Sequence, residues 1–160
     1  MPTLHLTSFI AAPRERVFDL SRNVSLHKVS MEHTGEQAIA GVTAGLINKD
    51  DTVTWKGKHL YKMRLFTSLI TEMKLYESFT DKMIKGDFKS YEHQHFFKST
   101  ENGTIVIDII NYETPYGWIG SLVNKLHLNS YLEKLINHRN SVIKQYAESD
   151  KWMALLNNRR

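Results

Sequence analysis

Residues 128–146, LNSYLEKLINHRNSVIKQY, predict a long helix with a single apolar face. Apolar residues recur every three or four positions, which places them on one side of an α-helix. This stripe comprises Leu128, Leu132, Leu135, Ile136, Val142, Ile143 and Tyr146. The opposite face is predicted to carry Glu133, Asn137, Asn140 and Lys144. Because Leu122 and Leu126 are out of phase with the stripe, we predict a bend or break near residues 127–130.

The residues before this helix predict the sheet on which it packs. Residues 3–10 favour an opening strand, Ala12-Pro13 favours the start of a helix, and residues 25–30 are compatible with a second short helix. Between residues 35 and 115 the pattern is typical of strands, expected at 51–59, 60–73, 75–84, 88–98 and 104–113.

A long helix with one apolar face must be covered, and only the sheet is large enough to cover it. The sequence therefore predicts an α+β fold in which a curved antiparallel sheet wraps around the long C-terminal helix. Such an arrangement often leaves a cavity that binds a ligand. We expect one domain over residues 1–150 and a tail over 151–160.

Composition excludes several classes of protein. The chain has 160 residues, 41% of them hydrophobic, and no cysteine, which excludes an intrinsically disordered chain, a disulfide scaffold and thiol catalysis. No apolar run reaches the length of a membrane span, and the first residues lack the pattern of a secretory signal. The net charge of +4 comes from interspersed residues. We therefore expect a cytoplasmic protein with no nucleic-acid partner, and we consider a homodimer.

Arg139 interrupts the apolar stripe, four residues after Leu135 and four before Ile143. Burying an unpaired guanidinium costs several kcal/mol, so this side chain needs a partner. Three interpretations remain open: an internal ion pair, a role in orienting a ligand, or a side chain that reaches solvent.

The strand expected at 88–98, with the strand that follows it, supplies candidate polar partners for Arg139. One of its faces carries Tyr91, His93, His95 and Phe97, and we expect this face to point inward because the other is mostly polar. The dipeptide Asn102-Gly103 predicts a hairpin. A two-residue loop places Asp108 opposite Phe97, and a four-residue loop places it opposite His95. A three-residue loop would turn Asp108 to the other face.

The two histidines and Asp108 permit two kinds of chemistry. Together they could ligate a metal, or a His–Asp pair could act as a general base near neutral pH. Core histidines bonded to an acid are commoner than either, and the sequence has no nucleophile, phosphate-loop or dinucleotide motif. We therefore predict no metal, no cofactor and no catalytic residue, and assign no role to His5, His27, His33 and His127.

Aromatic and methionine residues complete the predicted interior. Trp55 alternates with Val53, Tyr61 alternates with Met63 and Leu65, and Phe79 alternates with Met83. Each is compatible with a sheet core, and as a set they suit an adaptable apolar pocket.

These features resemble the helix-grip superfamily often called SRPBCC, which includes START lipid-binding domains, birch-pollen-allergen-like proteins and polyketide cyclases. The resemblance begins at residues 10–13, IAAP, with Val17 and Phe18, and continues through 45–47, 51–55, 79–83, 86–88 and 91–97. It extends over Asp108, Tyr112, Pro115-Tyr116-Gly117 and Arg139. Within the superfamily, the sequence most resembles the bacterial stand-alone ligand-binding branch. Some members of that branch are labelled cell division inhibitors.

The resemblance implies a cavity between sheet and helix for a small apolar or amphipathic molecule. Our leading hypothesis is noncatalytic binding by a carrier or sensor. The alternatives are a small cyclase, dehydratase or hydrolase that uses His95 and Asp108, and an interaction module with a filled core. The candidate ligand-binding residues are Trp55, Tyr61, Met63, Leu65, Phe79, Met83, Tyr91, His93, His95, Asp108, Tyr112, Leu132, Leu135, Arg139 and Ile143.

Overall fold

The computed structural model describes residues 2–115 and 122–157; for residues 122–125 it describes the backbone alone. The elements follow the order β1 (Thr3–Ile10), α1 (Arg14–Ser21), α2 (Val24–Ser30), the 3-10 turn η1 (Glu32–Thr34), β2 (Gln37–Gly41), β3 (Thr52–His59), β4 (Lys62–Lys74), β5 (Ser78–Lys85), β6 (Ser90–Thr100), β7 (Gly103–Glu113), α3 (Leu122–Ala147) and α4 (Trp152–Leu156). Across these residues, no helix has the length and apolarity that crossing a membrane requires.

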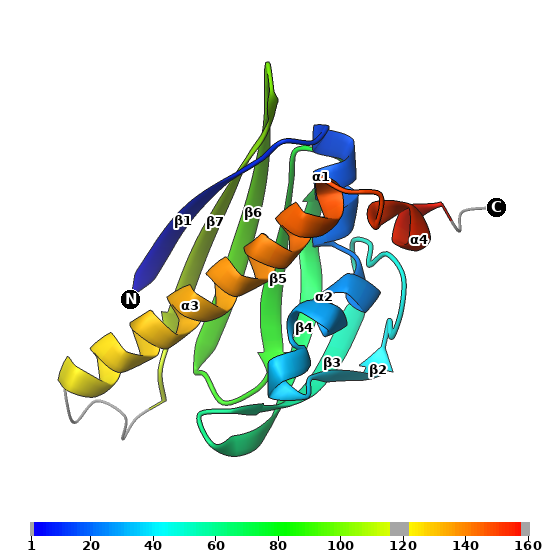
Figure 1. Cartoon of the computed structure of the whole chain (residues 1–160). Helices are drawn as coiled ribbons and strands as arrows, with labels where there is room; N and C mark the ends of the chain where they lie inside the picture. The colour runs from blue at the N-terminus through cyan, green and yellow to red at the C-terminus, as the bar shows by residue number, and fades with distance from the viewer. Residues whose placement is uncertain (1, 116–121, 158–160) are drawn as a thin grey trace.

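Seven strands form one antiparallel sheet in the order β1-β7-β6-β5-β4-β3-β2. The sheet curves around α3, which lies diagonally across it (Figure 1). Helices α1 and α2 follow β1 and contact α3. The predicted α+β architecture, with a curved sheet wrapped around a long helix and short helices after the first strand, is confirmed.

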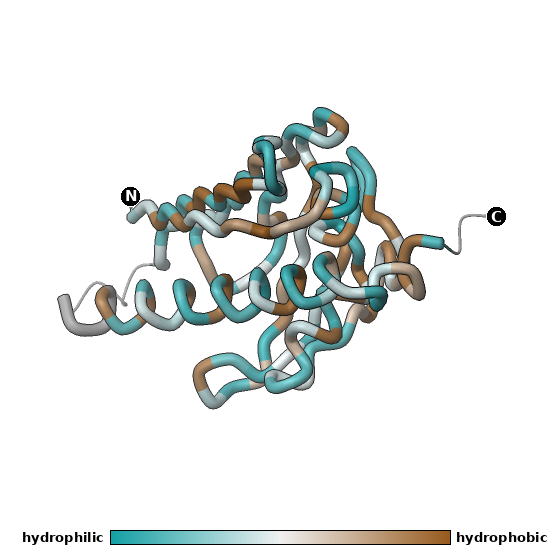
Figure 2. Tube along the Cα trace, turned by 45° about the horizontal axis from the view of Figure 1, so that its top comes forward, coloured by the Kyte–Doolittle hydropathy of each residue, from teal (hydrophilic) through white to brown (hydrophobic). Residues whose placement is uncertain are grey.

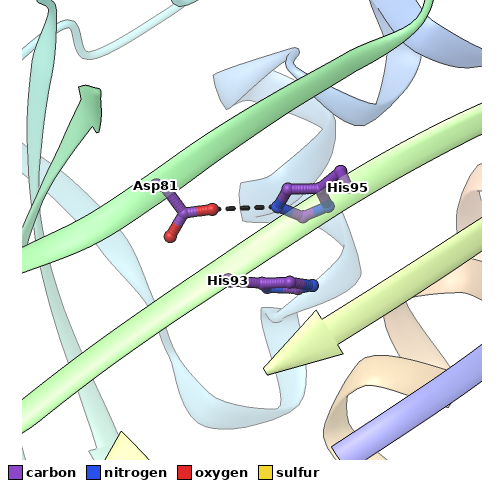
Figure 3. Close-up of side chains that lie close together, drawn as sticks. All are labelled: Asp81, His93 and His95. Atoms are coloured by element: carbon purple, nitrogen blue, oxygen red, sulfur yellow. Dashed lines mark hydrogen bonds and ion pairs between the residues drawn. The ribbon is translucent and has the colours of Figure 1, made fainter. Parts of the chain in front are cut away.

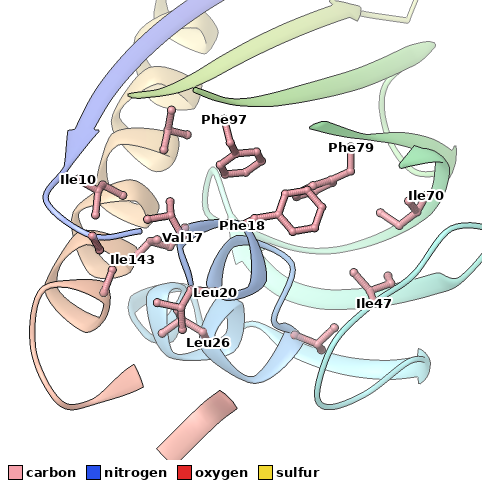
Figure 4. Close-up of a cluster of buried hydrophobic side chains, with 14 of the residues drawn as sticks. Ile10, Val17, Phe18, Leu20, Leu26, Ile47, Ile70, Phe79, Phe97 and Ile143 are labelled. Atoms are coloured by element: carbon pink, nitrogen blue, oxygen red, sulfur yellow. The ribbon is translucent and has the colours of Figure 1, made fainter. Parts of the chain in front are cut away.

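The two short helices form where the sequence supplies their ends. Pro13, at φ −58°, precedes the first turn of α1, a position at which its missing N–H leaves nothing unsatisfied. The Asn23 side chain accepts a hydrogen bond from the Leu26 backbone N–H at 3.0 Å and so caps α2. These ends turn Phe18 inward, where its ring meets Phe79 and Phe97 edge to face (Figure 4). The ring of Tyr76 also meets Phe18 edge to face.

The buried apolar side chains form two clusters at different places along α3. The first cluster packs α1 and the last turns of α3 against the sheet, with Val17, Phe18 and Ile143 at its centre (Figure 4). The second cluster packs the first half of α3 against β7 and comprises Ile110, Tyr112, Leu128, Leu132 and Ile136. The core is therefore divided rather than continuous.

The segment 151–160, which we expect to be a tail, contains the helix α4. Trp152, Leu155 and Leu156 are partly buried against the first cluster. The Arg16 guanidinium lies 4.1 Å from the centre of the Trp152 ring, a cation–π contact. Apolar residues at 152, 155 and 156 thus contact the core that the preceding residues form.

Helix α3 is continuous from Leu122 to Ala147, so the bend or break predicted near residues 127–130 is wrong. Leu126 is 59% exposed and Leu128 is 5% exposed, because two residues apart they lie on nearly opposite sides of the helix. Where the apolar residues move to another side of a helix, a different side is buried, but the backbone hydrogen bonds of the helix continue. Along the rest of α3, hydrophobic and hydrophilic residues recur on each turn (Figure 2).

The β6–β7 hairpin has the register that we predicted for a four-residue loop, with His95 opposite Asp108. Pairing continues one step further, to Thr100 and Gly103, so only Glu101 and Asn102 remain in the turn. Gly103 has a φ of 159° and lies against the backbone of Ile10, where a Cβ atom would come within 2.3 Å of the Ile10 carbonyl oxygen.

The β3–β4 hairpin differs from the prediction, because residues 60 and 61 form its turn and do not belong to a strand. His59 pairs with Lys62, so Trp55 lies opposite Phe66. Phe66, Ser68 and Ile70 consequently face inward, whereas Tyr61 is 96% exposed and Met63 is 56% exposed. A shift of one residue exchanges the two faces of a strand, which is why the expected inward direction of Tyr61 and Met63 is wrong.

The turn places two non-glycine residues in the left-handed region, Leu60 at φ 50° and Tyr61 at φ 66°. This conformation costs an L-residue roughly 1–2 kcal/mol, a penalty that glycine escapes. We expect Tyr61→Gly to be more stable than Tyr61→Ala by about 1 kcal/mol. Both variants lose the exposed ring, so urea unfolding of the pair isolates the backbone effect. Equal stabilities would show that the turn is unstrained.

Candidate functional site

A cavity of about 240 Å³ lies between the sheet and α3. Side chains from β3, β4, β5 and β6 line it on the sheet side, and Leu128, Leu132 and Ile136 line it on the helix side. A single water needs only about 10–15 Å³ of such volume, so there is room for an organic molecule. The cavity lies where the sequence predicts it.

The structure brings nine of the fifteen candidate residues to the wall of the cavity. They are Trp55, Leu65, Phe79, Tyr91, His93, His95, Leu132, Leu135 and Arg139. Leu65 reaches the wall although 46% of its surface is exposed.

The other six candidates lie elsewhere. Tyr61 and Met63 point to solvent, and Met83 packs against Gly86 beyond the cavity. Ile143 belongs to the first apolar cluster. Tyr112 belongs to the second cluster and donates a hydrogen bond to Asn129. Asp108 is fully buried behind the two histidines.

The polar centre of the site is a group that we name the histidine cluster: Asp81, His93, His95, Asp108, Arg139 and Asn140. His93 Nε2 lies 2.7 Å from Asp108 Oδ1. His95 Nε2 lies 2.9 Å from Asp81 Oδ2 (Figure 3). The two imidazole rings stack, with their centres 3.7 Å apart. Alternation along β6 places both rings on the same face, and neighbouring strands supply the carboxylates.

His95 is held between two carboxylates. Its Nδ1 lies 3.0 Å from Asp108 Oδ1, a close electrostatic contact that lacks the geometry of a hydrogen bond. A neutral imidazole carries one N–H and can donate to only one of these acids.

Helix α3 contributes Arg139 and Asn140 to the same cluster. Arg139 donates to the Ser21 carbonyl at 3.0 Å and to Asn140 Oδ1 at 3.3 Å, and lies 3.7 Å from Asp108. Asn140 Nδ2 donates to Asp108 Oδ2 at 2.7 Å. The predicted outward direction of Asn140 is therefore wrong: this residue is 4% exposed because the buried carboxylate draws its amide inward.

Burial and neighbouring charges set the protonation of this cluster. Burial alone would raise the pKa of Asp108, but the contacts from His93 and His95 hold it well below its ordinary value. Burial and the nearby His95 lower the pKa of His93 from 6.5 to about 4, against the opposing effect of Asp108. Burial, with the charge on Asp81, raises the pKa of Tyr91. At neutral pH the site thus presents an ionised Asp108, a neutral His93 and a protonated Tyr91.

A second polar group, the glutamate cluster, comprises His27, Glu36, His59 and Tyr131, all of which border the cavity. Glu36 Oε1 lies 2.7 Å from His27 Nε2, and Glu36 Oε2 lies 3.0 Å from His59 Nε2. His59 Nδ1 lies 2.6 Å from the Tyr131 hydroxyl, which joins the end of β3 to α3. Gly57 leaves the space that Glu36 occupies, since a Cβ there would be 3.2 Å from Glu36 Cβ.

Sequence reasoning missed Asp81, Glu36 and His59, and it assigned no role to His27. The alternation of Phe79, Asp81 and Met83 in one strand was a usable signal for Asp81, because it shares the face of Phe79. Glu36 lies in a connection after η1, where no period applies, so its direction could not be read from the sequence.

Among the described residues, Asp81, His93 and His95 form a group that could hold a metal ion. Each offers one ligand atom, and these atoms lie within 4.8 Å of one another. The carboxylate differs from the one expected from sequence, since Asp81 takes the position that we considered for Asp108.

Similar architectures occur in solved structures. An aromatase/cyclase from a Streptomyces species superposes with a TM-score of 0.73 at 11% identity, over 92% of this chain and 93% of its own. The protein TTHA0849 from Thermus thermophilus superposes at 0.70 with 18% identity, over 96% and 98%. A START superfamily protein from Mycobacterium smegmatis superposes at 0.67 with 12% identity, over 91% and 97%.

The chain has the helix-grip fold. A major latex-like protein from Panax ginseng shares it, with a TM-score of 0.67 at 14% identity over 92% of this chain and 98% of its own. The resemblance to SRPBCC proteins is thereby confirmed for the fold. No protein-family model and no curated protein sequence matches the chain.

Glu36 gives stability a specific dependence on pH. Burial would raise the pKa of Glu36, but hydrogen bonds from His27 and His59 lower it from 4.5 to about 2. The stabilisation is therefore complete above the ordinary value of 4.5 and is lost as the pH falls toward 2. We expect Glu36→Gln to lower the free energy of unfolding by about 1–3 kcal/mol at neutral pH.

Thermal melts across that pH range test this expectation. The difference between wild type and Glu36→Gln should shrink as the pH falls through the window. Glu101→Gln, in the exposed β6–β7 turn, is the control and should match wild type throughout. A difference in stability between wild type and Glu36→Gln that stays constant with pH would contradict the proposed ionisation of Glu36.

Asp108 is predicted to be the most sensitive acid in the chain. Asp108→Asn removes the negative charge that faces Arg139. It also replaces the carboxylate that accepts a hydrogen bond from Asn140 Nδ2 with a neutral amide. We expect the free energy of unfolding to fall by about 3–5 kcal/mol, measured by urea titration. The exposed control Asp150→Asn should change it by less than about 0.5 kcal/mol. A small effect of Asp108→Asn would mean that the cluster tolerates a neutral group.

Proposed function

We propose that this protein binds a small amphipathic molecule in the cavity, as a noncatalytic carrier or sensor. One observation carries the proposal: the cavity has mainly apolar walls, and its polar side chains are gathered into the histidine and glutamate clusters. A site of this kind favours a ligand with an apolar body and a few oxygen-bearing groups.

The apolar walls provide the affinity. Trp55, Ile70, Phe79 and Ile136 all face the cavity, and burying apolar ligand surface against them contributes roughly 25 cal/mol per Å². The cavity volume limits the ligand to a compact molecule, unless side chains at the wall move on binding.

The polar groups provide the orientation. Arg139 lines the cavity and uses two of its five N–H groups in hydrogen bonds to described residues, which leaves donors for a ligand. A carboxylate, phosphate or carbonyl oxygen is the complementary group. The histidines and Tyr91 add further contacts on the same side.

The fold comparisons support this proposal without identifying the ligand. A START superfamily protein shares this fold over nearly the whole chain. The resemblance to START lipid-binding domains implies a small apolar or amphipathic ligand. The cavity also counts against the alternative of an interaction module with a filled core.

A small enzyme of the cyclase, dehydratase or hydrolase kind is the second candidate, supported by the pair His95 and Asp81 at the cavity wall. Here His95 would exchange protons with a bound ligand, and Asp81 rather than Asp108 would be its cavity-facing partner. The aromatase/cyclase with the same fold supports this alternative. His95→Ala would then abolish turnover while ligand binding and fold persist; a ligand that is bound without any chemical change would contradict it.

Native mass spectrometry of the protein purified from its own host tests the binding proposal. We expect a discrete extra mass that disappears on denaturation. A cavity-filling variant, Ser68→Phe, should lose that mass, because Ser68 is buried at the cavity wall.

Ser99→Phe, at an exposed position of β6, is the matched control and should keep the mass. Circular dichroism must show that both variants are folded. A bare wild-type chain that no lipid, polyketide, sterol or aromatic compound stabilises in thermal melts would overturn the proposal.

A further inference from the structure

The face of the histidine cluster that borders the cavity carries three metal-ligating side chains. Asp81 from β5 and His93 and His95 from β6 offer one carboxylate oxygen and two imidazole nitrogens within 4.8 Å of one another. All three residues line the cavity, and their side chains lie close together (Figure 3). Two histidines and one carboxylate form a common set of protein ligands for divalent transition metals.

The spacing of the donors fits a metal centre. Asp81 Oδ2 and His95 Nε2 are 2.9 Å apart. Adjacent ligands with bonds of about 2.0–2.2 Å are about 2.8–3.1 Å apart in octahedral geometry and about 3.3–3.6 Å apart in tetrahedral geometry. Because the rings of His93 and His95 are stacked with centres 3.7 Å apart, one of them has to rotate for both nitrogens to bind the same ion.

A second shell of protein groups already supports the ligands. Asp108 contacts His93 through Nε2, so Nδ1 is the nitrogen with which His93 would ligate. Asp108 also contacts Nδ1 of His95, the nitrogen on the other side of the ring from Asp81. Carboxylates commonly hold metal-ligating histidines in this way, and Asn140 in turn holds Asp108.

The hydrogen-bond count at His95 also points to an ion. Nε2 of His95 is hydrogen-bonded to Asp81, whereas Nδ1 makes only an electrostatic contact with Asp108. Among the described residues, this buried Nδ1 atom has no hydrogen-bond partner. A cation at Nε2 would let Nδ1 carry the proton and donate it to Asp108.

We propose that Asp81, His93 and His95 bind one divalent transition-metal ion at the wall of the cavity. The chemistry of the ligands favours zinc, iron(II) or cobalt(II) over magnesium or calcium. The remaining coordination positions face the cavity, where water or an oxygen of a bound molecule can occupy them. This reverses our sequence-based expectation of no metal, because that expectation did not place Asp81 beside the histidines.

Charge near the site is compatible with an ion. Asp81 and Asp108 contribute two negative charges and Arg139 one positive charge, so the cluster is net negative when both histidines are neutral. With a divalent ion the total becomes positive, which favours an anionic group at the open positions. Metal uptake itself needs no organic ligand, so it stands or fails independently of the proposed binding function.

Titration of the chelator-treated full chain with cobalt(II) chloride tests the proposal. We expect one ion per chain, with visible absorption bands of a protein-bound ion, and displacement by zinc. Asp81→Asn and His95→Gln should each weaken binding at least about ten-fold. Only variants with the wild-type circular dichroism spectrum are scored.

The double variant His33→Ala/His138→Ala is the matched control, because these exposed rings form a neighbouring histidine pair on the surface, with centres 4.8 Å apart. It should bind like wild type. As a readout that needs no variant, zinc should shift the imidazole nitrogen resonances of His93 and His95 in wild-type NMR spectra. No uptake, uptake lost in the surface double variant, or unshifted resonances of His93 and His95 would each overturn the proposal.

Discussion

The carboxylate of Asp108 is the group on which the rest of the structure depends. It is fully buried, and a buried charge is tolerated only where hydrogen bonds and opposite charges surround it. His93 and His95 reach it from β6, and Asn140 and Arg139 reach it from α3. The carboxylate therefore joins helix and sheet at one fixed register. Sliding α3 by a turn would remove Asn140 and Arg139 from the acid, so the apolar stripe alone does not set the position of the helix.

The glutamate cluster joins the same two layers at a second place. Glu36 binds His27 of α2 and His59 of β3, and His59 contacts Tyr131 of α3. Because polar contacts fix the helix at both places, apolar side chains need not fill all the space between them. The cavity is thus compatible with a well-determined fold. Its polar groups serve two purposes, since the side chains that position α3 are also those that a ligand would meet.

The sequence predicted the architecture because the long apolar stripe of α3 and the alternation of the strands are period signals. The same periods put His93 and His95 on an inward face and Arg139 within the apolar stripe, and the resemblance implied that these residues line a cavity. Sequence reasoning failed where the direction of a side chain does not follow from the repeat of a helix or a strand. The turn at Leu60 and Tyr61 has neither glycine nor asparagine, so nothing marked it, and the faces of β4 were exchanged as a result. Asn140 appeared polar and outward because its partner, Asp108, lies 32 residues away in the chain. Glu36 depends on contacts from two separate elements, α2 and β3, which no local pattern contains.

Among the described residues, the core is divided into two apolar clusters of unequal size. The larger apolar cluster unites α1, α4 and the last turns of α3 with the sheet, whereas the smaller one holds only the first half of α3 on β7. Local opening of a protein follows its smallest buried contacts. Amide hydrogens near Leu128 and Leu132 should therefore exchange with solvent sooner than those near Ile143. The first turns of α3 should therefore open before the cluster around Phe18 does.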